Sequence, residues 1–559
     1  MGRPPVPNAA LIVQTSSMAQ RDLVNLCAPC HSRRAELRDM DRPAAEPLDA
    51  HLPTLLGPGL FYPDGQILDE VYEVHSFLQS KMYEKGVRCS DCHDVHSAKR
   101  HKEGNELCLR CHRADTYDTA SHHFHKKVYQ GKPSDGATCK ACHMPGRNYM
   151  VVHFRRDHSM RVPRPDLSPA LGTPNACNQA GCHADKPLKW VVAGYDKWYG
   201  AKRKPHYGTV LAAAREGRPE ARADLLALAA DRLRPAIVRA TALDLLWEYP
   251  GEDSTKLLEQ AMGDDDALVR RTAVNRFRHD DPAHFVKAIA PRLKDPVLAV
   301  RAEAASRLAG APSETLSEPQ KEAHRAALAE YRSILAFSAD MPSGRHNWAL
   351  LEDALDRPGE AEKQYRKALT IDDQFYMSAA NLAINLSRQG RNEEAEGLLR
   401  QALRANPRNA ASAFNLGLLL AEMGKNDQAE AALRQALEAD PSLAPAAYNL
   451  AVLVGARDPA QAARLCRKAA ELQPGEPRFA FSLAYYELQQ GKESDAVATL
   501  EALVGTHPAF GDAVLVLGEL YGKRGLSTRA AELYDRALAA QGLADRERAE
   551  IASRRRALP

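Results

Sequence analysis

Five cysteine pairs, each followed directly by a histidine, are the residues of this sequence whose types and spacing could carry chemistry. Four pairs have the pattern Cys-x-x-Cys-His, and the fifth has a wider gap between its cysteines. Two thiols spaced as in Cys-x-x-Cys can add to the two vinyl groups of one haem, and the next histidine is then held beneath the iron as its proximal ligand. We therefore predict five covalently attached haem c groups. The attachment cysteines are Cys27, Cys30, Cys89, Cys92, Cys108, Cys111, Cys139, Cys142, Cys177 and Cys182, and the proximal ligands are His31, His93, His112, His143 and His183.

Two other chemistries also use paired cysteines. A zinc ribbon completes four ligands from two Cys-x-x-Cys knuckles and has no use for a histidine after every second cysteine. A disulfide framework suits a short secreted chain, and bonds between such close neighbours would constrain little. The remaining cysteine, Cys466, lies alone far downstream, where we predict a small buried side chain. Haem attachment is the interpretation that the pattern favours.

Histidine is abundant in the same region. Residues 1–183 contain nine histidines besides the five proximal ones. Low-spin electron-transfer haems commonly take a second axial histidine, so five haems could use up to five of the nine. The supply is therefore sufficient for axial ligation on both faces of every iron.

The three central motifs all lie in the short segment between Cys89 and His143. Because so short a segment cannot bury three macrocycles in an ordinary apolar core, the haems must supply much of the core themselves. We expect loops and short helices wrapped around haems that pack close to one another. Close packing predicts fast electron transfer between them.

Downstream, the sequence becomes rich in alanine and leucine at helical spacing. Arg239, Arg270 and Arg301 recur at a constant interval in IVRATAL, LVRRTAV and AVRAEAA, each after a loop with aspartate or proline. This pattern resembles HEAT-type repeats, in which helix pairs stack into a solenoid. We predict that the arginines are structural and bond to acidic residues in the loop of the neighbouring repeat.

A second period begins near residue 344. Asn347, Asn381, Asn415 and Asn449 are evenly spaced, and NLAINLSRQGRNEEAEGLLRQALRANP and its successor resemble the tetratricopeptide consensus. We count six units, with glycine at the turn between helices and proline after the second helix. Such an array binds peptides or partner proteins on its concave face, and the alternative is a rigid spacer or a dimerisation surface.

Composition limits the remaining choices. The chain has 559 residues, 44% of them apolar, and a formal charge of +3, which is too balanced to indicate nucleic-acid binding. No run reaches the length of a transmembrane segment. We predict a mainly α protein: a loop-rich multihaem cytochrome c domain at 1–200, followed by an α-solenoid of HEAT-like repeats at 201–320 and tetratricopeptide repeats at 321–559.

The haem region as a whole resembles a bacterial multihaem cytochrome c family of the octahaem, cytochrome c-554-like type that carries helical repeats. The resemblance rests on LCAPCHSRRAEL, PGLFYPDGQILDEVYEVHSFLQSKMYEKGVRCSDCHDVHS, YDTASHHFHK, CKACHMPGRNYMVV, RDHSMRVPRPDLSPALGTPNACNQAGCH and KWYG. By position it implies the distal ligand candidates His51, His96, His122, His123, His125 and His158. His75 and His153 depart from the family pattern, and His101 lies in a basic run, so these three are not predicted as ligands.

The chain also differs from the family before its first motif. The family has a signal peptide and three further Cys-x-x-Cys-His motifs there, whereas the short stretch before Cys27 contains no such motif here. Haem is attached after export, so the resemblance implies a periplasmic or exported protein and predicts that this chain is an N-terminally truncated member.

Two functions are open at this point. The first is electron transfer along five haems, with the helical arm docking redox protein partners. The alternative is a haem-dependent oxidoreductase of small nitrogen compounds, of the hydroxylamine or nitrite type, which would need a five-coordinate iron with acid or base groups nearby. No motif has lysine in place of the proximal histidine, and the spare histidines favour the first.

Overall fold

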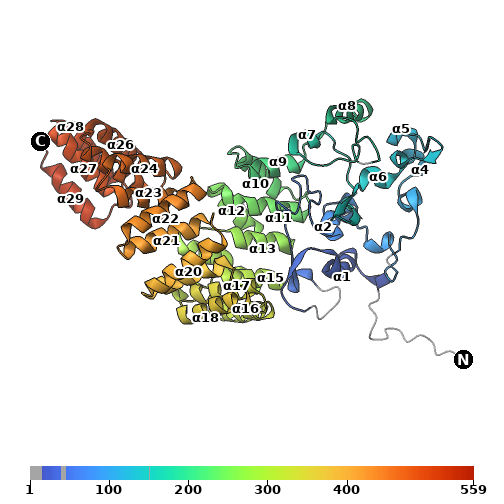
Figure 1. The fold of residues 1–559 in the computed structure, drawn as a ribbon, viewed down its shortest axis with the longest axis horizontal. Helices are drawn as coiled ribbons and strands as arrows, with labels where there is room; N and C mark the ends of the chain where they lie inside the picture. Colours follow the sequence, from blue (N-terminus) through green and yellow to red (C-terminus); the bar gives the residue numbers. More distant parts are fainter. Residues whose placement is uncertain (1–14, 40–45, 98, 150, 180, 559) are drawn as a thin grey trace. The chain divides into compact units, whose positions relative to one another are not determined.

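The computed structural model describes residues 15–39, 46–97, 99–149, 151–179 and 181–558 (Figure 1). The chain is mainly helical and divides into two compact units, Met1–Ala339 and Asp340–Pro559. None of the described helices is both long enough and apolar enough to cross a membrane.

The described part of the first unit up to Tyr199 forms short elements joined by loops. Its α-helices are α1 (Gln20–His31), α2 (Glu73–Phe77), α3 (Lys81–Glu84), α4 (Ala114–Tyr117), α5 (Ala120–His123), α6 (Cys139–His143), α7 (Leu167–Leu171) and α8 (Leu188–Tyr199). Three antiparallel hairpins pair β1 (Arg34–Glu36) with β2 (His51–Pro53), β3 (Val128–Tyr129) with β4 (Lys132–Pro133), and β5 (Gly146–Tyr149) with β6 (His153–Arg156). In the third hairpin Arg147 lies opposite Arg155.

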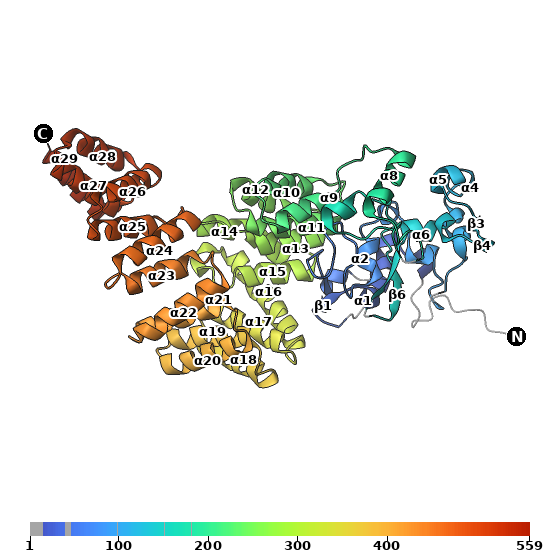
Figure 2. The same cartoon turned by 45° about the horizontal axis from the view of Figure 1, so that its top comes forward.

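Longer helices follow in the same unit. They are α9 (Tyr207–Arg215), α10 (Ala221–Ala230), α11 (Ala236–Leu245), α12 (Glu252–Ala261), α13 (Ala267–Arg276), α14 (Pro282–Ile289), α15 (Leu298–Arg307) and α16 (Glu318–Phe337). Helices α11, α13 and α15 pack in succession, because alanine, leucine and valine recur on their buried faces (Figure 2).

The three repeated arginines join successive repeats. The guanidinium of Arg239 donates to Asp264 at 2.6 and 3.1 Å, and that of Arg270 donates to Asp295 at 2.8 and 2.9 Å. This confirms the prediction of a structural role for the first two. Arg301 instead bonds to Glu330, which lies within α16 and not in a loop.

The short elements and the repeats belong to one compact unit. Leu298 N donates to the Asp49 carboxylate at 2.7 Å, and Leu56 N donates to the Thr241 hydroxyl at 3.1 Å. The observed division at 339/340 therefore differs from the three predicted domains. Helix α16 packs against α15, so the end of the first unit lies after the predicted boundary at 320.

The second unit consists of helix pairs. They are α17 (Pro342–Ala354) with α18 (Pro358–Ile371), α19 (Tyr376–Arg388) with α20 (Asn392–Ala405), α21 (Ala410–Glu422) with α22 (Asn426–Ala439), α23 (Ala444–Val454) with α24 (Pro459–Leu472), α25 (Pro477–Gln489) with α26 (Glu493–Thr506), and α27 (Gly511–Lys523) with α28 (Ser527–Ala539). A final helix, α29 (Asp545–Arg556), packs against α27 and α28.

Small residues let the paired helices approach. Gly417 faces Leu433 of the partner helix so closely that an added Cβ would lie 2.7 Å from its side chain. The turns between paired helices use glycine at positive φ, as at Gly390 (77°) and Gly424 (74°). The six pairs agree with the predicted repeat count, and Cys466 is fully buried in α24, as predicted.

Candidate haem-binding sites

Each of the first four cysteine motifs lies on a helical turn. The first motif occupies the end of α1, and the fourth forms α6. The second begins with the 3-10 helix Cys89–Asp91 and the third with the end of the 3-10 helix Gly104–Arg110, and in both the second cysteine caps that helix. A helical turn places residues i and i+3 on one side, as attachment of both thiols to one macrocycle requires. The fifth motif, Cys177 to His183, has turns and bends among its described residues, which its wider cysteine spacing permits. All ten cysteines are free thiols.

Two pairs of consecutive motifs are joined by thiol contacts. The Cys27 and Cys89 side chains are hydrogen-bonded, which lowers the pKa of Cys27 to about 7 and raises that of Cys89. The Cys108 and Cys139 side chains are bonded likewise, and the pKa of Cys139 falls to about 7. The first motif therefore touches the second, and the third touches the fourth.

The other neighbours in sequence are close enough for their thiols to interact electrostatically. Burial raises the pKa of Cys92, and the neighbouring charges of Asp91 and Cys111 raise it further. Burial also raises the pKa of Cys142 to about 11, with a further contribution from Cys177. The five motifs thus follow one another in space in the order of the sequence.

Three proximal histidines face a second histidine ring. The pairs are His93 with His158 at a centroid separation of 6.5 Å, His143 with His122 at 6.1 Å, and His183 with His125 at 6.0 Å. The rings are inclined to one another by 30°, 13° and 37° respectively. Two imidazoles bound on opposite sides of one iron at about 2 Å have centroids about 6.3 Å apart. The three separations match that spacing.

The nitrogen that a histidine offers to a metal is decided by the bond that its other nitrogen makes. His143 Nδ1 donates to the carbonyl of Arg161 at 2.8 Å, and His158 Nδ1 donates to the carbonyl of Arg156 at 2.9 Å. His31 Nδ1 lies 3.2 Å from the Glu73 carboxylate. These bonds leave Nε2 free for a metal and fix the orientation of the ring.

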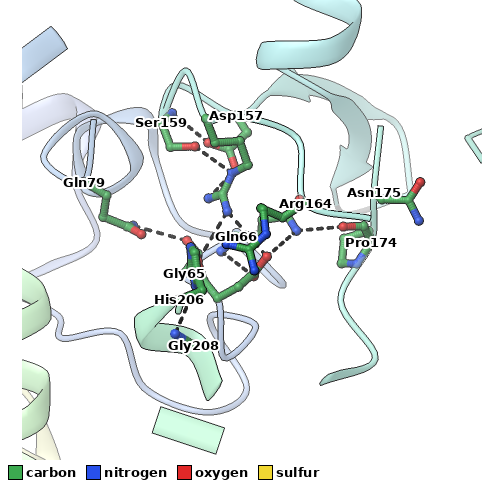
Figure 3. A network of polar contacts seen from close by, with 12 residues as sticks. Gly65, Gln66, Gln79, Asp157, Ser159, Arg164, Pro174, Asn175, His206 and Gly208 are labelled. Carbon is green, nitrogen blue, oxygen red and sulfur yellow. Dashed lines mark hydrogen bonds and ion pairs between the residues drawn. The ribbon is translucent and has the colours of Figure 1, made fainter. Parts of the chain in front are cut away.

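Gln66 and Asp157 belong to a buried polar network (Figure 3) that adjoins two of these histidines. The guanidinium of Arg161 lies 3.4 Å from Asp64 and 3.2 Å from Asp157, which directly precedes His158. Gln66 bonds to Asp64 at 2.7 Å and to the carbonyl of Pro174 at 2.8 Å. The Arg161 carbonyl also accepts the hydrogen bond from His143 Nδ1. The network therefore positions His158 and His143, which belong to two different histidine pairs.

The segment around the second and third motifs lacks a protein core. No residue that the structure describes between 81 and 136 is buried. Several large apolar side chains there are exposed instead, namely Val95, Tyr117, Phe124, Val128 and Tyr129. A stable fold needs its apolar surface covered, and a macrocycle bound at each motif would cover it.

Buried guanidinium nitrogens without a partner also occur near the motifs. They include Arg34 Nε, Arg147 Nε and Arg155 Nη1. Such N–H groups are costly to leave unpaired, and a carboxylate group such as a haem propionate would satisfy them. Three features of this region fit a covalently held haem: the thiol and imidazole donors of the motifs, the spacing of the facing histidine rings, and the exposed apolar side chains that a macrocycle would cover.

The three other predicted distal ligands have different surroundings. His51 is buried in β2 with Nδ1 unpartnered, His96 is exposed on a loop, and Nε2 of His123 is buried without a partner. Their roles as ligands stay predictions. His112 contacts the Tyr117 ring at 5.6 Å.

The histidines that were not predicted as ligands have other surroundings. His75 is fully buried, with its ring 5.8 Å from that of Phe61. His101 Nε2 bonds to the carbonyl of Ser90 at 2.9 Å, and His153 is exposed in β6. Among the described residues, no three His, Cys, Asp or Glu side chains gather as a metal-ion cluster.

Sequence reasoning missed the residues that support the histidines. Glu73 and Arg161 belong to no repeated motif, and their roles depend on contacts between segments that are distant in the sequence. Glu73 contacts His31, which lies 42 positions away in the sequence, so no local pattern around Glu73 could have revealed this role.

Comparisons with known proteins concern the second unit. The tetratricopeptide repeat family model matches four overlapping stretches, residues 381–444, 414–477, 452–509 and 481–545. The C-terminal region therefore contains tetratricopeptide repeats, which suggest protein partners. No curated protein matches the chain.

Several solved structures of low sequence identity are also similar to part of this chain. The MamA protein is 17% identical over 30% of this chain and 91% of its own, with a TM-score of 0.28. YrrB, a TPR protein with an unusual peptide-binding site, is 17% identical over 33% and 96%, with a TM-score of 0.29. PilF of Pseudomonas aeruginosa is 21% identical over 40% and 97%, with a TM-score of 0.32.

Proposed function

We propose that this protein is an exported, periplasmic multihaem c-type cytochrome that carries electrons along five haems and docks redox partners through its tetratricopeptide repeats. The observation that carries the proposal is the facing of three motif histidines by second histidines at the spacing of a shared iron. Haem iron supplies one-electron chemistry by cycling between its ferric and ferrous states.

The residues of the chain have distinct roles in this proposal. The ten motif cysteines would anchor the cofactors, and His31, His93, His112, His143 and His183 would hold them from the proximal side. His158, His122 and His125 would supply the second ligand at the second, fourth and fifth sites. These three sites would then have no place for a substrate, which favours electron transfer over catalysis there.

The order of the motifs supports a linear route. Thiol contacts join the first motif to the second and the third to the fourth, and electrostatic proximity joins the remaining neighbours. The chain therefore holds each site next to the sites before and after it in the sequence. Electrons would pass in that order.

The second unit supports partner docking through its first helices. Leu350, Leu418 and Val452 occupy equivalent positions in three of the repeats and are exposed. Helices α17, α19, α21 and α23, the first helices of their pairs, contact one another in succession, so the side chains that they carry belong to one continuous face. An apolar row of this kind is suited to a peptide segment of a partner protein.

Covalent haem content tests the proposal. The full chain is expressed behind a cleavable export signal with the haem-attachment machinery, and haem is counted by pyridine haemochrome and intact mass. We expect five haems per chain, and four in each variant that replaces both cysteines of one motif by alanine. Cys466→Ala is the matched control and retains all five. A chain without covalent haem would overturn the proposal.

A further inference from the structure

His31 differs from the other oriented histidines of the haem sites in what its Nδ1 contacts. The acceptor is the Glu73 carboxylate at 3.2 Å, whereas His143 and His158 donate to the neutral carbonyls of Arg161 and Arg156. The first site therefore places a negative charge directly behind a proximal ligand.

Glu73 is held in that position by its helix. It opens α2, which packs against α1, the helix that ends in His31. The neighbouring Val74 and Phe77 are buried, so the helix cannot turn its carboxylate away without exposing apolar surface. The contact is thus a built feature of the first site and not an incidental surface pair.

One opposing charge lies nearby. The Arg155 guanidinium is within electrostatic reach of His31 and stacks on the Tyr72 ring at 4.9 Å. Its Nη1 is buried without a partner, which suits a propionate of the same haem. Paired in that way, Arg155 would leave the Glu73 carboxylate as the charge that acts on the imidazole.

A carboxylate that accepts the Nδ1 proton makes an imidazole a stronger donor to metal. A stronger donor stabilises the ferric state over the ferrous state and lowers the reduction potential. We propose that Glu73 is a positioning residue that lowers the reduction potential of the haem at Cys27 and Cys30. This inference rests on the proposed function.

The consequence is a direction for electron flow. Because the motifs follow one another in sequence order, the first site lies at one end of the row. A lowered potential there makes electron transfer from the first site to the second more favourable. Partners that donate electrons would therefore meet the protein at α1 and α2.

Redox titration of the full-length protein tests this inference, with Glu73→Gln as the variant. We expect the reduction equilibrium of one component to shift about tenfold toward the ferrous form, which is about 59 mV for one electron. The other four components should not move. Glu73→Asp keeps the negative charge on a shorter side chain, farther from His31, and should shift the potential of the same component by less.

Glu84→Gln is the matched control, because Glu84 is exposed on α3 and its loss changes the net charge equally. It should leave all components in place. Haem content is measured in every variant, so that a chain without haem contradicts the proposed function itself. Five haems with an unchanged titration in Glu73→Gln would overturn the inference about Glu73 alone.

Discussion

The histidines of the first unit differ in how far the sequence could predict them. The spacing of a cysteine motif indicates where a haem could be attached, so the ten cysteines and five proximal histidines are predictions from spacing alone. The histidine that faces each of them was not, because His93 and His158, for example, are far apart in the sequence. The family resemblance implies six distal candidates. Three of them, His158, His122 and His125, lie near the ring of a predicted proximal histidine in the fold.

Replacing one facing histidine should open a single site. In His122→Ala, a haem attached at Cys139 and Cys142 would lose its distal ligand while both thioether bonds would remain. We expect unchanged haem content and one haem converted from low-spin to high-spin, read from the spin-state bands of the resonance Raman spectrum. His153→Ala, at an exposed position, is the control and should leave the spectrum unchanged. An unaltered spectrum for His122→Ala would contradict the pairing with His143.

Elements of the two units were predictable to different degrees. The two repeat periods located the stacked helices, because each repeat buries its apolar face on its neighbour. The short helices and hairpins before α9 have no such period. Between residues 81 and 136, where no described residue is buried, the chain shows no amphipathic pattern from which its elements could be read.

The repeated arginines give a stability test at this scale. Arg270→Ala leaves the Asp295 carboxylate, whose side chain is 1% exposed, without its bidentate partner. Loss of one partner from a buried pair costs about 3 kcal/mol or more. Arg301→Ala removes a pair whose Glu330 is 42% exposed and should cost about 1 kcal/mol or less. Thermal unfolding followed by circular dichroism should rank the two variants in that order, and equal losses would contradict the account.

Two glycines of adjacent helices offer a second comparison. Gly417→Ala would force an added Cβ to 2.7 Å from Leu433 and should destabilise the second unit by about 1 to 3 kcal/mol. Gly397 lies within α20 and has no heavy atom within 4 Å of an added Cβ. Gly397→Ala should therefore stabilise the unit by about 1 kcal/mol through helix propensity. Denaturant unfolding of both variants measures the change in the free energy of unfolding. A stabilising effect of Gly417→Ala would contradict this prediction.

The whole molecule combines two kinds of core. Three hydrophobic clusters of the second unit lie entirely within Asp340–Pro559, built largely from leucine and alanine of the helix pairs. In the first unit, the repeats have an apolar core of their own, but the motif region before them does not over a long stretch of its described residues. The second unit should therefore fold without any cofactor, whereas the motif region should depend on one.

That difference predicts the behaviour of separate parts. Residues 340–559 expressed alone should give a helical circular dichroism spectrum and one cooperative thermal transition. The full chain made without haem attachment should retain this transition, while the motif region is digested rapidly by protease. Protection of residues 81–136 in the haem-free chain would show that protein alone provides their core.

Low-temperature electron paramagnetic resonance of the oxidised full-length protein tests the central claim most directly. The three facing histidine pairs are inclined by 13° to 37°, nearer to parallel than to perpendicular, so at least three haems should give rhombic low-spin ferric signals. Integration against the haem content should assign these signals to three or more of five haems. A spectrum dominated by high-spin iron would contradict the assignment of the paired histidines as axial ligands, and with it the account of the protein as an electron carrier.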